Sequence, residues 1–318
     1  MQNRCKDTKI ENKHVPKTDI LWFNKFVQIV KLEGSVIRNV SALNRTIGKC
    51  LVQALCVDIR NIASFVLMVF CALDSQSVSL SMWALSCAQN KAASDIRRFT
   101  RWLKNSACEA LTWYKPLFLH AIGVWGDSPI LLALDTTMLF DEFSAIRVSL
   151  ICLGRSIPVT WRVIRHESAS VKWAEYQGLL EQASEWMPKN VQVILLADRG
   201  FVSRKLLLQL RNLGWNWRIR VMDKQVFTCV GKIIKPRTLP LKMGDAQFFT
   251  RRIDFGKGLE SLSLSAGWPK GSKEAWYVLS DTPAGMEIFM DYACRFGIEE
   301  GFRDEKNGGF HFGRERDP

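Results

Sequence analysis

The sequence predicts an α/β protein: a mixed sheet flanked by helices, a β-rich insertion before the last helix, and an all-helical unit before the sheet. Three observations support this class. From Phe23 to His120, apolar residues recur at three- and four-residue spacings, as in amphipathic helices. Residues 123–129 then concentrate Gly, Asp, Ser and Pro, which end helices. Beyond them, short apolar runs alternate with amphipathic segments, which is typical of a sheet covered by helices.

The elements follow in order from these patterns. A flexible basic N-terminus over residues 1–20 precedes the helical unit at 21–128. We then expect a strand at 130–137, a hairpin of 145–153 and 156–164 turning at Gly154 and Arg155, a helix at 170–186, a strand at 191–197, a helix at 202–213 and a strand at 216–221. The order predicts a mixed sheet whose sites form at strand ends.

A different composition interrupts this order. Residues 222–273 are rich in Lys, Gly and β-formers and have little helical period. A strand at 276–280 and a helix at 284–306 then return to the earlier pattern. We therefore expect an α/β core formed by 129–221 and 274–318, with 222–273 inserted as a β-rich segment.

Charge indicates the class of partner, and the cysteine pattern indicates the cellular compartment. The chain has 44 Lys+Arg against 31 Asp+Glu and a net charge of +13, which favours nucleic acid as the partner. Its nine cysteines are scattered singly, which excludes a disulfide framework or a zinc site and indicates a reducing compartment. The longest apolar run is too short to span a bilayer, and the first residues lack the apolar segment of a signal peptide. We expect a cytoplasmic protein without a membrane partner.

Two carboxylates stand where buried strands end. Asp135 follows ILLAL and Asp198 follows VQVILLA. An Asp after a strand also starts turns or caps helices, and this alternative is open for either residue alone. Two such cases in one sheet favour a shared site at its edge.

The last predicted helix carries a third carboxylate within a polar stripe. At 100° per residue, the stripe is about 80° wide. Its members are Tyr292, Arg295, Glu299, Arg303 and Lys306. A separate apolar face is formed by Met290, Cys294, Ile298 and Phe302. The alternative is a solvated face with ion pairs at Arg295–Glu299 and Glu299–Arg303.

These three acids suit metal-dependent phosphodiester chemistry. Carboxylates are the hard oxygen ligands that hold Mg²⁺ or Mn²⁺. Two such ions activate a water or a 3′-hydroxyl and stabilise the leaving oxygen. Arg and Lys beside the third acid would hold phosphates.

The spacing of these residues resembles a known family. Asp198-Arg199-Gly200-Phe201 follows an apolar strand, and Tyr292, Arg295, Glu299 and Lys306 match the Y-(2)-R-(3)-E-(6)-K signature. This pattern is similar to transposases of bacterial insertion sequences in the DDE superfamily, in the subgroup with that signature. LALDTT around Asp135 matches as well, and residues 78–105 resemble that family's helical segment with paired arginines.

The resemblance implies that residues 129–221 and 274–318 form an RNase H-like catalytic core, with Asp135, Asp198 and Glu299 as the catalytic triad. They would bind two Mg²⁺, for which Mn²⁺ substitutes. The enzyme would nick transposon ends by hydrolysis, and the freed 3′-hydroxyl would attack another strand, often through a hairpin, before joining to target DNA. The protein would bind double-stranded DNA, at the transposon ends and at the target, as a homodimer. It would act in the bacterial cytoplasm, at the nucleoid.

Further residues gain roles from the same resemblance. Tyr292, Arg295 and Lys306 would position phosphates near the cleaved end. The insertion would help to hold a flipped terminal base, with Trp268 or Trp276 as stacking candidates, although a buried tryptophan is the commoner case.

Outside the core, one helical face of the unit at 21–128 is basic, and we expect this unit to be the DNA-binding domain. Arg97, Arg101 and Lys104 share a face that Arg98 flanks, which suits a DNA backbone or, alternatively, a solvated surface. Several other acids are expected to be solvated, with Glu300 the main rival to Glu299. They are Asp141, Glu142, Glu300, Asp304 and Glu305.

Departures from the family leave two other functions open. The sequence stops at Pro318, twelve residues after Lys306, whereas relatives continue into a further helical region. A catalytically inactive, C-terminally shortened DNA-binding remnant or inhibitor of transposition is therefore one alternative, and a stand-alone RNase H-like nuclease is another. Gly297 and Gly301 within the last helix indicate close contact with the sheet.

Overall fold

The computed structural model describes residues 40–55, 57–87 and 91–307. The predicted flexible N-terminus at 1–20 and the closing residues 308–318 lie outside the described residues. The chain divides into two compact units, Met1–Tyr114 and Lys115–Pro318. This division falls within a helix, whereas the sequence placed the boundary between residues 128 and 129.

The described part of the first unit is helical. It contains α2 (Val40–Ala54), α3 (Ile59–Ser75), α4 (Leu80–Cys87), α5 (Ala92–Leu103) and the start of α6 (Ala110–Ile122). The helix α3 begins after Asp58, whose side chain accepts a hydrogen bond from the Arg60 backbone N–H at 2.9 Å. Phe65, Trp102 and Trp113 pack with ring centroids 5.1–5.4 Å apart and form an aromatic core.

No single helix in the described residues is long and apolar enough to cross a bilayer, and α3 and α4 reach that length and composition only together, across a bend of 96°.

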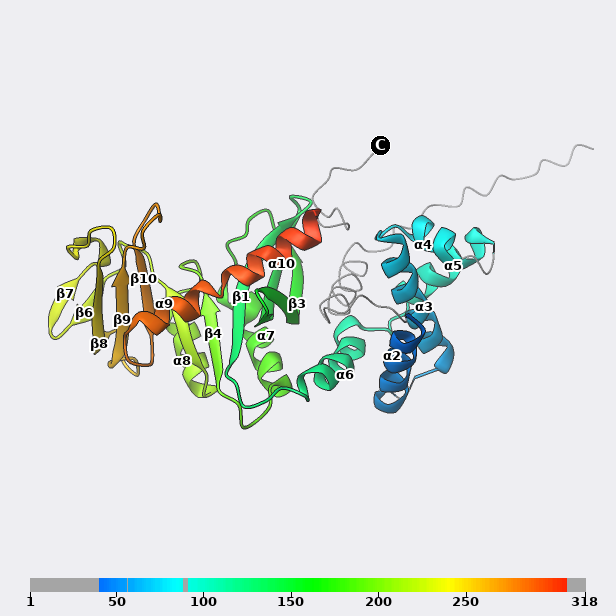
Figure 1. The fold of residues 1–318 in the computed structure, drawn as a ribbon, viewed down its shortest axis with the longest axis horizontal. Coiled ribbons are helices and arrows are strands. Elements are labelled where there is room, and N and C mark those ends of the chain that lie inside the picture. Colours follow the sequence, from blue (N-terminus) through cyan, green and yellow to red (C-terminus); the bar gives the residue numbers. More distant parts are fainter. Residues whose placement is uncertain (1–39, 56, 88–90, 308–318) are drawn as a thin grey trace, which may run out of the picture. The chain divides into compact units, whose positions relative to one another are not determined.

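The second unit is built on one mixed sheet (Figure 1). Its strands are β1 (Ile130–Leu139), β2 (Phe143–Cys152), β3 (Arg155–Arg165), β4 (Val193–Ala197), β5 (Asn216–Arg220), β6 (Phe227–Cys229), β7 (Lys232–Ile234), β8 (Ala246–Asp254), β9 (Leu262–Gly267) and β10 (Trp276–Ser280). The strand order is β3-β2-β1-β4-β5-β10-β9-β8-β6-β7. Strands β1, β4 and β5 are parallel, and the other described pairs are antiparallel. The predicted mixed α/β class is confirmed.

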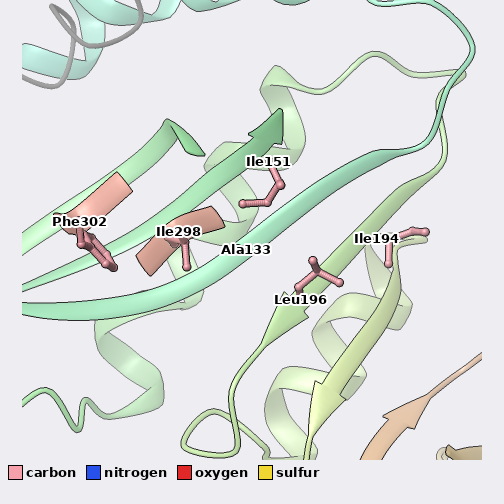
Figure 2. Packing of buried hydrophobic residues seen from close by; sticks show 6 residues of the cluster. All are labelled: Ala133, Ile151, Ile194, Leu196, Ile298 and Phe302. Carbon is pink, nitrogen blue, oxygen red and sulfur yellow. The ribbon is translucent and has the colours of Figure 1, made fainter. Parts of the chain in front are cut away.

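Helices cover the sheet from both sides. The helices α7 (Trp173–Trp186) and α8 (Arg204–Asn212) connect β3 to β4 and β4 to β5. On the other face lie α9 (Met286–Ala293) and α10 (Phe296–Asn307), which run across the sheet in Figure 1. Figure 2 shows the core beneath α10, where Ile298 and Phe302 pack with Ala133, Ile194 and Leu196. This burial fixes the helix that carries Glu299.

The predicted hairpin forms, with its turn one residue earlier than expected. Leu153 and Gly154 both have positive φ, at 51° and 73°, as in a two-residue turn of the type that suits twisted strands. Arg155 is already in β3, where it pairs with Cys152.

The β-rich insertion extends the same sheet. Strand β9 pairs with β10, β8 with β9, and the short β6–β7 hairpin with β8, while a 3₁₀ turn at Pro236–Thr238 lies between β7 and β8. The residues 222–273 therefore lengthen the sheet beyond β10.

The predicted continuous last helix is wrong, because it breaks at residues 294–295. Bonds of the i to i+3 type run from the Arg295 N–H to the Tyr292 carbonyl and from the Ile298 N–H to the Arg295 carbonyl, both at 3.0 Å. This tighter turn changes which face of each segment meets the sheet. As predicted, Ile298 and Phe302 are buried, but Met290 and Cys294 are exposed. The helix α9 instead buries Ile288, Phe289 and Tyr292.

Two glycines let α10 approach the β2–β3 hairpin. A methyl group at Gly297 would lie 3.4 Å from the Arg155 carbonyl oxygen. At Gly301 it would overlap Ser156 Oγ and lie 3.1 Å from Arg147 Nη2. The expected close contact between this helix and the sheet is confirmed.

Candidate active site

The register of the parallel strands sets the positions of three polar side chains. Leu134 pairs with Ala197, and Ala197 pairs with Ile219. The next residues along β1, β4 and β5 are Asp135, Asp198 and Arg220. Asp198 directly follows β4, but Asp135 lies within β1, which stays paired with β2 as far as Leu139, so the expectation that Asp135 stands where a strand ends is wrong. Because the parallel pairing of β1 with β4 ends at Leu134, both carboxylates and Arg220 still lie together beyond the carboxyl end of β4.

Arg295 joins two of the predicted catalytic acids. Its Nη1 lies 2.9 Å from Asp135 Oδ2, and its Nη2 donates to Glu299 Oε1. The Arg295 residue is only 5% exposed, although Glu299 remains partly open to solvent. The structure therefore brings Asp135 and Glu299, which are far apart in sequence, around one buried guanidinium.

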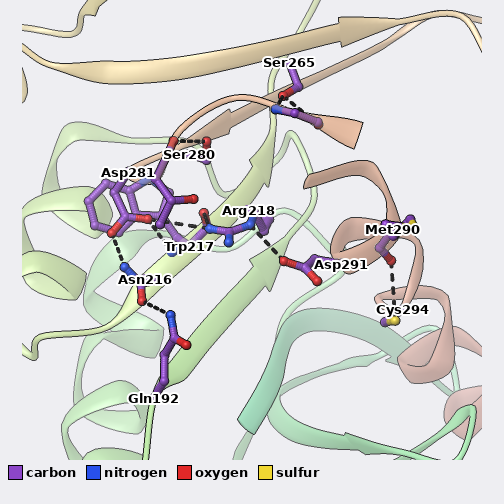
Figure 3. A network of polar contacts seen from close by, with 12 residues as sticks. Gln192, Asn216, Trp217, Arg218, Ser265, Ser280, Asp281, Met290, Asp291 and Cys294 are labelled. Atoms are coloured by element: carbon purple, nitrogen blue, oxygen red, sulfur yellow. Dashed lines mark hydrogen bonds and ion pairs between the residues drawn. The ribbon is translucent and has the colours of Figure 1, made fainter. Parts of the chain in front are cut away.

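Tyr292 reaches the remaining acid. Its phenol donates to Asp198 Oδ1 at 3.2 Å, and burial raises the pKa of this phenol to about 12. The ring packs edge-on against Trp276, with centroids 5.7 Å apart. In Figure 3, Arg218 on β5 donates to Asp291 at 3.1 Å, which ties the residue before Tyr292 to the sheet.

The charges within this site influence one another. Burial raises the pKa of Asp135, while the Arg295 charge and a 2.8 Å bond from the Thr136 N–H oppose that rise. Burial lowers the pKa of Arg295, but the nearby Tyr292, Asp135 and Glu299 together raise it above its usual value. The guanidinium thus stays charged beside its two carboxylates.

Two further arginines flank the acids and share a carboxylate. Glu274, before β10, lies 2.7 Å from Arg220 Nη2 and 3.4 Å from Arg199 Nη1. The hydrogen bond from Arg220 holds the pKa of Glu274 below its usual value. Because Arg199 directly follows Asp198, a cationic surface with one exposed acid across it adjoins the site.

The other predicted site residues occupy different surroundings. Lys306 is half-buried near the end of α10. Trp276 packs on Tyr292 and, at 6.0 Å, on Phe296. Trp268 lies after β9, where its Nε1 donates to the Ser272 carbonyl at 3.1 Å. The stacking role of both tryptophans stays a prediction.

The predicted basic patch is divided in the structure. Arg97, Arg101 and Lys104 are exposed, whereas Arg98 is partly buried and donates through Nε to Ser64 Oγ at 3.0 Å. Arg98, Arg101 and Arg60 line a hollow of about 610 Å³ between α3 and α5. Its remaining lining residues are Asn61, Ser64, Ser94, Trp102 and Asn105. DNA contact by the four predicted cations stays a prediction.

The expected solvent exposure of Glu305 is wrong. Its carboxylate is buried and accepts a hydrogen bond from Arg147 Nη1.

The rival acid Glu300 forms an ion pair with Arg303 at 2.9 Å, in place of the predicted pair between Arg303 and Glu299. Only the predicted pair of Arg295 with Glu299 forms.

The sequence analysis missed the arginines within strands. Arg147 stands in the apolar run FSAIRVSLIC, and Arg218 and Arg220 alternate in NWRIRV. A lone cation in a run read as a buried strand needs an acidic partner, because an isolated buried charge is costly. That signal indicates that an acidic partner exists, but only the fold identifies it as Glu305 for Arg147 and as Asp291 for Arg218.

A family model described as a transposase DDE domain matches residues 146–316, more than half of the 318 residues. The chain belongs to the transposase DDE domain family. The matched DDE range contains Asp198, Tyr292, Arg295 and Glu299, while Asp135 precedes it.

A cryo-EM structure of a piggyBac transposase synaptic complex with hairpin DNA is also similar to this chain. The similarity covers 91% of this chain and 68% of that chain, with 12% identity and a TM-score of 0.43. No curated protein matches this DDE-family chain.

Proposed function

We propose that this chain is a transposase of the YREK-signature subgroup, which cuts and joins DNA at the ends of an insertion sequence. The observation that carries the proposal is the convergence of Asp135, Asp198 and Glu299 around Arg295 and Tyr292. The strand order β3-β2-β1-β4-β5, with β4 and β5 parallel to β1, supports an RNase H-like core. Family membership supports the reaction class.

The donor set of the site suits divalent cations, which DDE transposase domains generally use. Asp135 and Glu299 already hold a cation between them, the Arg295 guanidinium. In this conformation, no three acidic, His or Cys side chains within the described ranges are as closely grouped as a metal site requires. Binding of an ion by both acids therefore requires Arg295 to leave at least one of them.

Asp135, Asp198 and Glu299 would hold two Mg²⁺, or Mn²⁺ in their place. When bound, the ions would activate a water or a 3′-hydroxyl and stabilise the leaving oxygen of the cleaved phosphodiester. The Tyr292 phenol, which stays protonated at neutral pH, orients the Asp198 carboxylate by its hydrogen bond.

The cations of the site would hold the DNA. Arg295, once released from a carboxylate, has two N–H groups to offer to a phosphate, as a planar guanidinium does in bidentate contacts. Lys306 would contact the same strand. Arg199 and Arg220 would bind further phosphates after displacement of Glu274, whose exposed carboxylate bridges them.

Assembly and location follow from the reaction. Two transposon ends must be cut and joined to one target, so the active form would be a homodimer on double-stranded DNA. It would act in the bacterial cytoplasm at the nucleoid. The net charge of +13 supports attraction to such a polyanion.

The test uses the purified full chain and a labelled duplex that carries the sequences flanking its own gene. Nicking and joining to a target plasmid should require Mg²⁺ or Mn²⁺, fail with Ca²⁺, and disappear in Asp198→Ala while duplex binding persists. Binding without metal-dependent nicking would overturn the proposal. Nicking without any joined product would indicate a nuclease instead.

A further inference from the structure

A buried ion pair lies beneath the far half of α10. Arg147 on β2 and Glu305 on α10 are separated by 158 positions, and their side chains are 0% and 5% exposed. Arg147 Nη2 also donates to Ser156 Oγ at 3.2 Å, and its guanidinium carbon lies 4.1 Å from the centroid of the Phe302 ring. The pair thus joins the helix to both strands of the β2–β3 hairpin.

Stability alone does not account for this pair. Two charges taken out of water lose hydration, and apolar residues of similar size often replace such pairs without loss of stability. Arg147 Nε, moreover, has no hydrogen-bond partner among the residues that the structure describes. The pair costs desolvation free energy and leaves one guanidinium N–H unbonded among the described residues. Its presence is therefore better explained by the placement that it imposes on α10 than by a contribution to stability.

The position of Arg147 connects it to the active site. Its Cα partner across the β1–β2 ladder is Asp135, and directly opposed residues of an antiparallel pair face the same side. Asp135 forms an ion pair with Arg295, which lies four residues before Glu299. Arg147 forms an ion pair with Glu305, which lies six residues after Glu299. Adjacent positions of the sheet thus hold the chain on both sides of the third catalytic acid.

These two attachments restrict the helix in two ways. Contacts on both sides of Glu299 oppose sliding of α10 along its axis. Six residues of an α-helix advance by 600°, so Glu305 and Glu299 point in directions about 120° apart. A rotation that moved Glu299 away from Asp135 would therefore also break the buried pair.

We propose that Arg147 and Glu305 are positioning residues that set the rotation and height of α10, and thereby the location of the Glu299 carboxylate relative to Asp135 and Asp198. This inference rests on the proposed function of the three acids. It assigns no contact with DNA or metal to Arg147 or Glu305.

The neighbouring surface pair provides a matched control. Arg155 and Asp304 join the same hairpin to the same helix at 3.2 Å, but both side chains are 46% exposed. Surface pairs of this kind contribute little to structure or stability. A positioning role for the buried pair predicts different consequences for the two replacements.

The experiment replaces each pair by apolar residues in the full chain. The double variant Arg147→Met/Glu305→Leu should keep its circular dichroism spectrum and melting temperature, because no unpaired buried charge is left. Its Mn²⁺ affinity, measured by calorimetry without DNA, should fall roughly 10-fold or more, as expected when the support of metal-binding side chains is lost. The rate of nicking should fall, with the concentration of DNA needed for half-maximal rate unchanged.

The control variant Arg155→Met/Asp304→Leu should retain the Mn²⁺ affinity of the original chain. Equal Mn²⁺ affinity in both double variants and the original chain would overturn the proposal, as would equal losses in both variants. If the buried-pair variant fails to fold, Arg147→Lys is used, which keeps the charge but loses the forked contacts to Ser156 and Glu305. Reduced Mn²⁺ affinity in this folded variant supports positioning, and unchanged affinity overturns it.

A readout without metal separates this inference from the proposed function. Amide hydrogen exchange in α10 should be faster in the buried-pair variant than in the control variant. If the original chain binds no Mn²⁺, the proposed function fails, while the exchange rates still decide whether the pair holds the helix. Equal exchange rates in the two variants would overturn the positioning role.

Discussion

The contact between Gly301 and the β2–β3 hairpin predicts that Gly301→Ala destabilises the protein. Alanine is favoured over glycine inside a helix by about 1 kcal/mol. The new methyl group would, however, overlap Ser156 Oγ and lie 3.1 Å from Arg147 Nη2. The serine would have to rotate, which breaks its 3.2 Å bond from Arg147, or the helix would have to move.

The magnitude follows from these opposing effects. Overfilling a packed site costs about 1–3 kcal/mol, and a hydrogen bond to a charged group contributes about 1.5–3 kcal/mol. After subtraction of the helix preference from either cost, we expect a net loss of about 1 kcal/mol in the free energy of unfolding. For a unit of this size, that loss lowers the melting temperature by roughly 2–4 °C.

Gly178→Ala in α7 is the matched control. Gly178 is exposed, and a methyl group there would have no heavy atom within 4 Å, so only the helix preference applies. This variant should be more stable than the original chain by about 1 kcal/mol. Urea unfolding followed by circular dichroism measures both variants. A Gly301→Ala variant as stable as the original chain would refute the close contact between α10 and the hairpin.

Three further predictions concern charge and DNA. Glu274→Ala should tighten binding to any duplex and steepen its salt dependence by about 1–2 in slope, because Arg199 and Arg220 are freed; equal tightening by the exposed control Glu185→Ala would show only a general charge effect. The double change Arg98→Glu/Arg101→Glu should weaken binding at all sequences and flatten the slope by about 2, and an unchanged slope removes these residues from the interface. The Tyr292 pKa of about 12 lies above its unfolded value of about 10, so its contribution to stability is fully present below pH 10 and is lost as pH rises toward 12. In urea denaturation, the free energy of unfolding should fall less between pH 9 and 11 in Tyr292→Phe than in the original chain. An identical fall in the variant and in the original chain would contradict the burial of this phenol.

Local patterns were sufficient to predict the core strands β1 to β5 and β10, and the positions of Asp135 and Asp198 after the apolar runs of β1 and β4. The runs ILLAL and VQVILLA end in a carboxylate, and parallel pairing of β1 with β4 places those ends side by side. The hairpin was displaced by one residue, because turn composition does not specify which two residues adopt positive φ. The predicted strand at 276–280 coincides with β10.

The break in the predicted last helix could not be derived from the sequence pattern. Helical periodicity assumes 100° per residue throughout, and the tight turn at 294–295 changes the direction of everything before it. As a result Met290 is exposed, and Tyr292 and Arg295 are buried at the site. The Arg147–Glu305 pair depends on tertiary packing, since its members lie 158 positions apart and neither has a local signal that names the other.

The most direct test of the account compares Glu299→Gln with Glu300→Gln in metal-dependent nicking of the labelled duplex. The two acids are adjacent, but only Glu299 contacts Arg295 beside Asp135, whereas Glu300 pairs with Arg303. The account predicts that Glu299→Gln abolishes Mg²⁺-dependent nicking while duplex binding persists, and that Glu300→Gln nicks like the original chain. Nicking that survives Glu299→Gln and disappears in Glu300→Gln would contradict the assignment of the third catalytic acid.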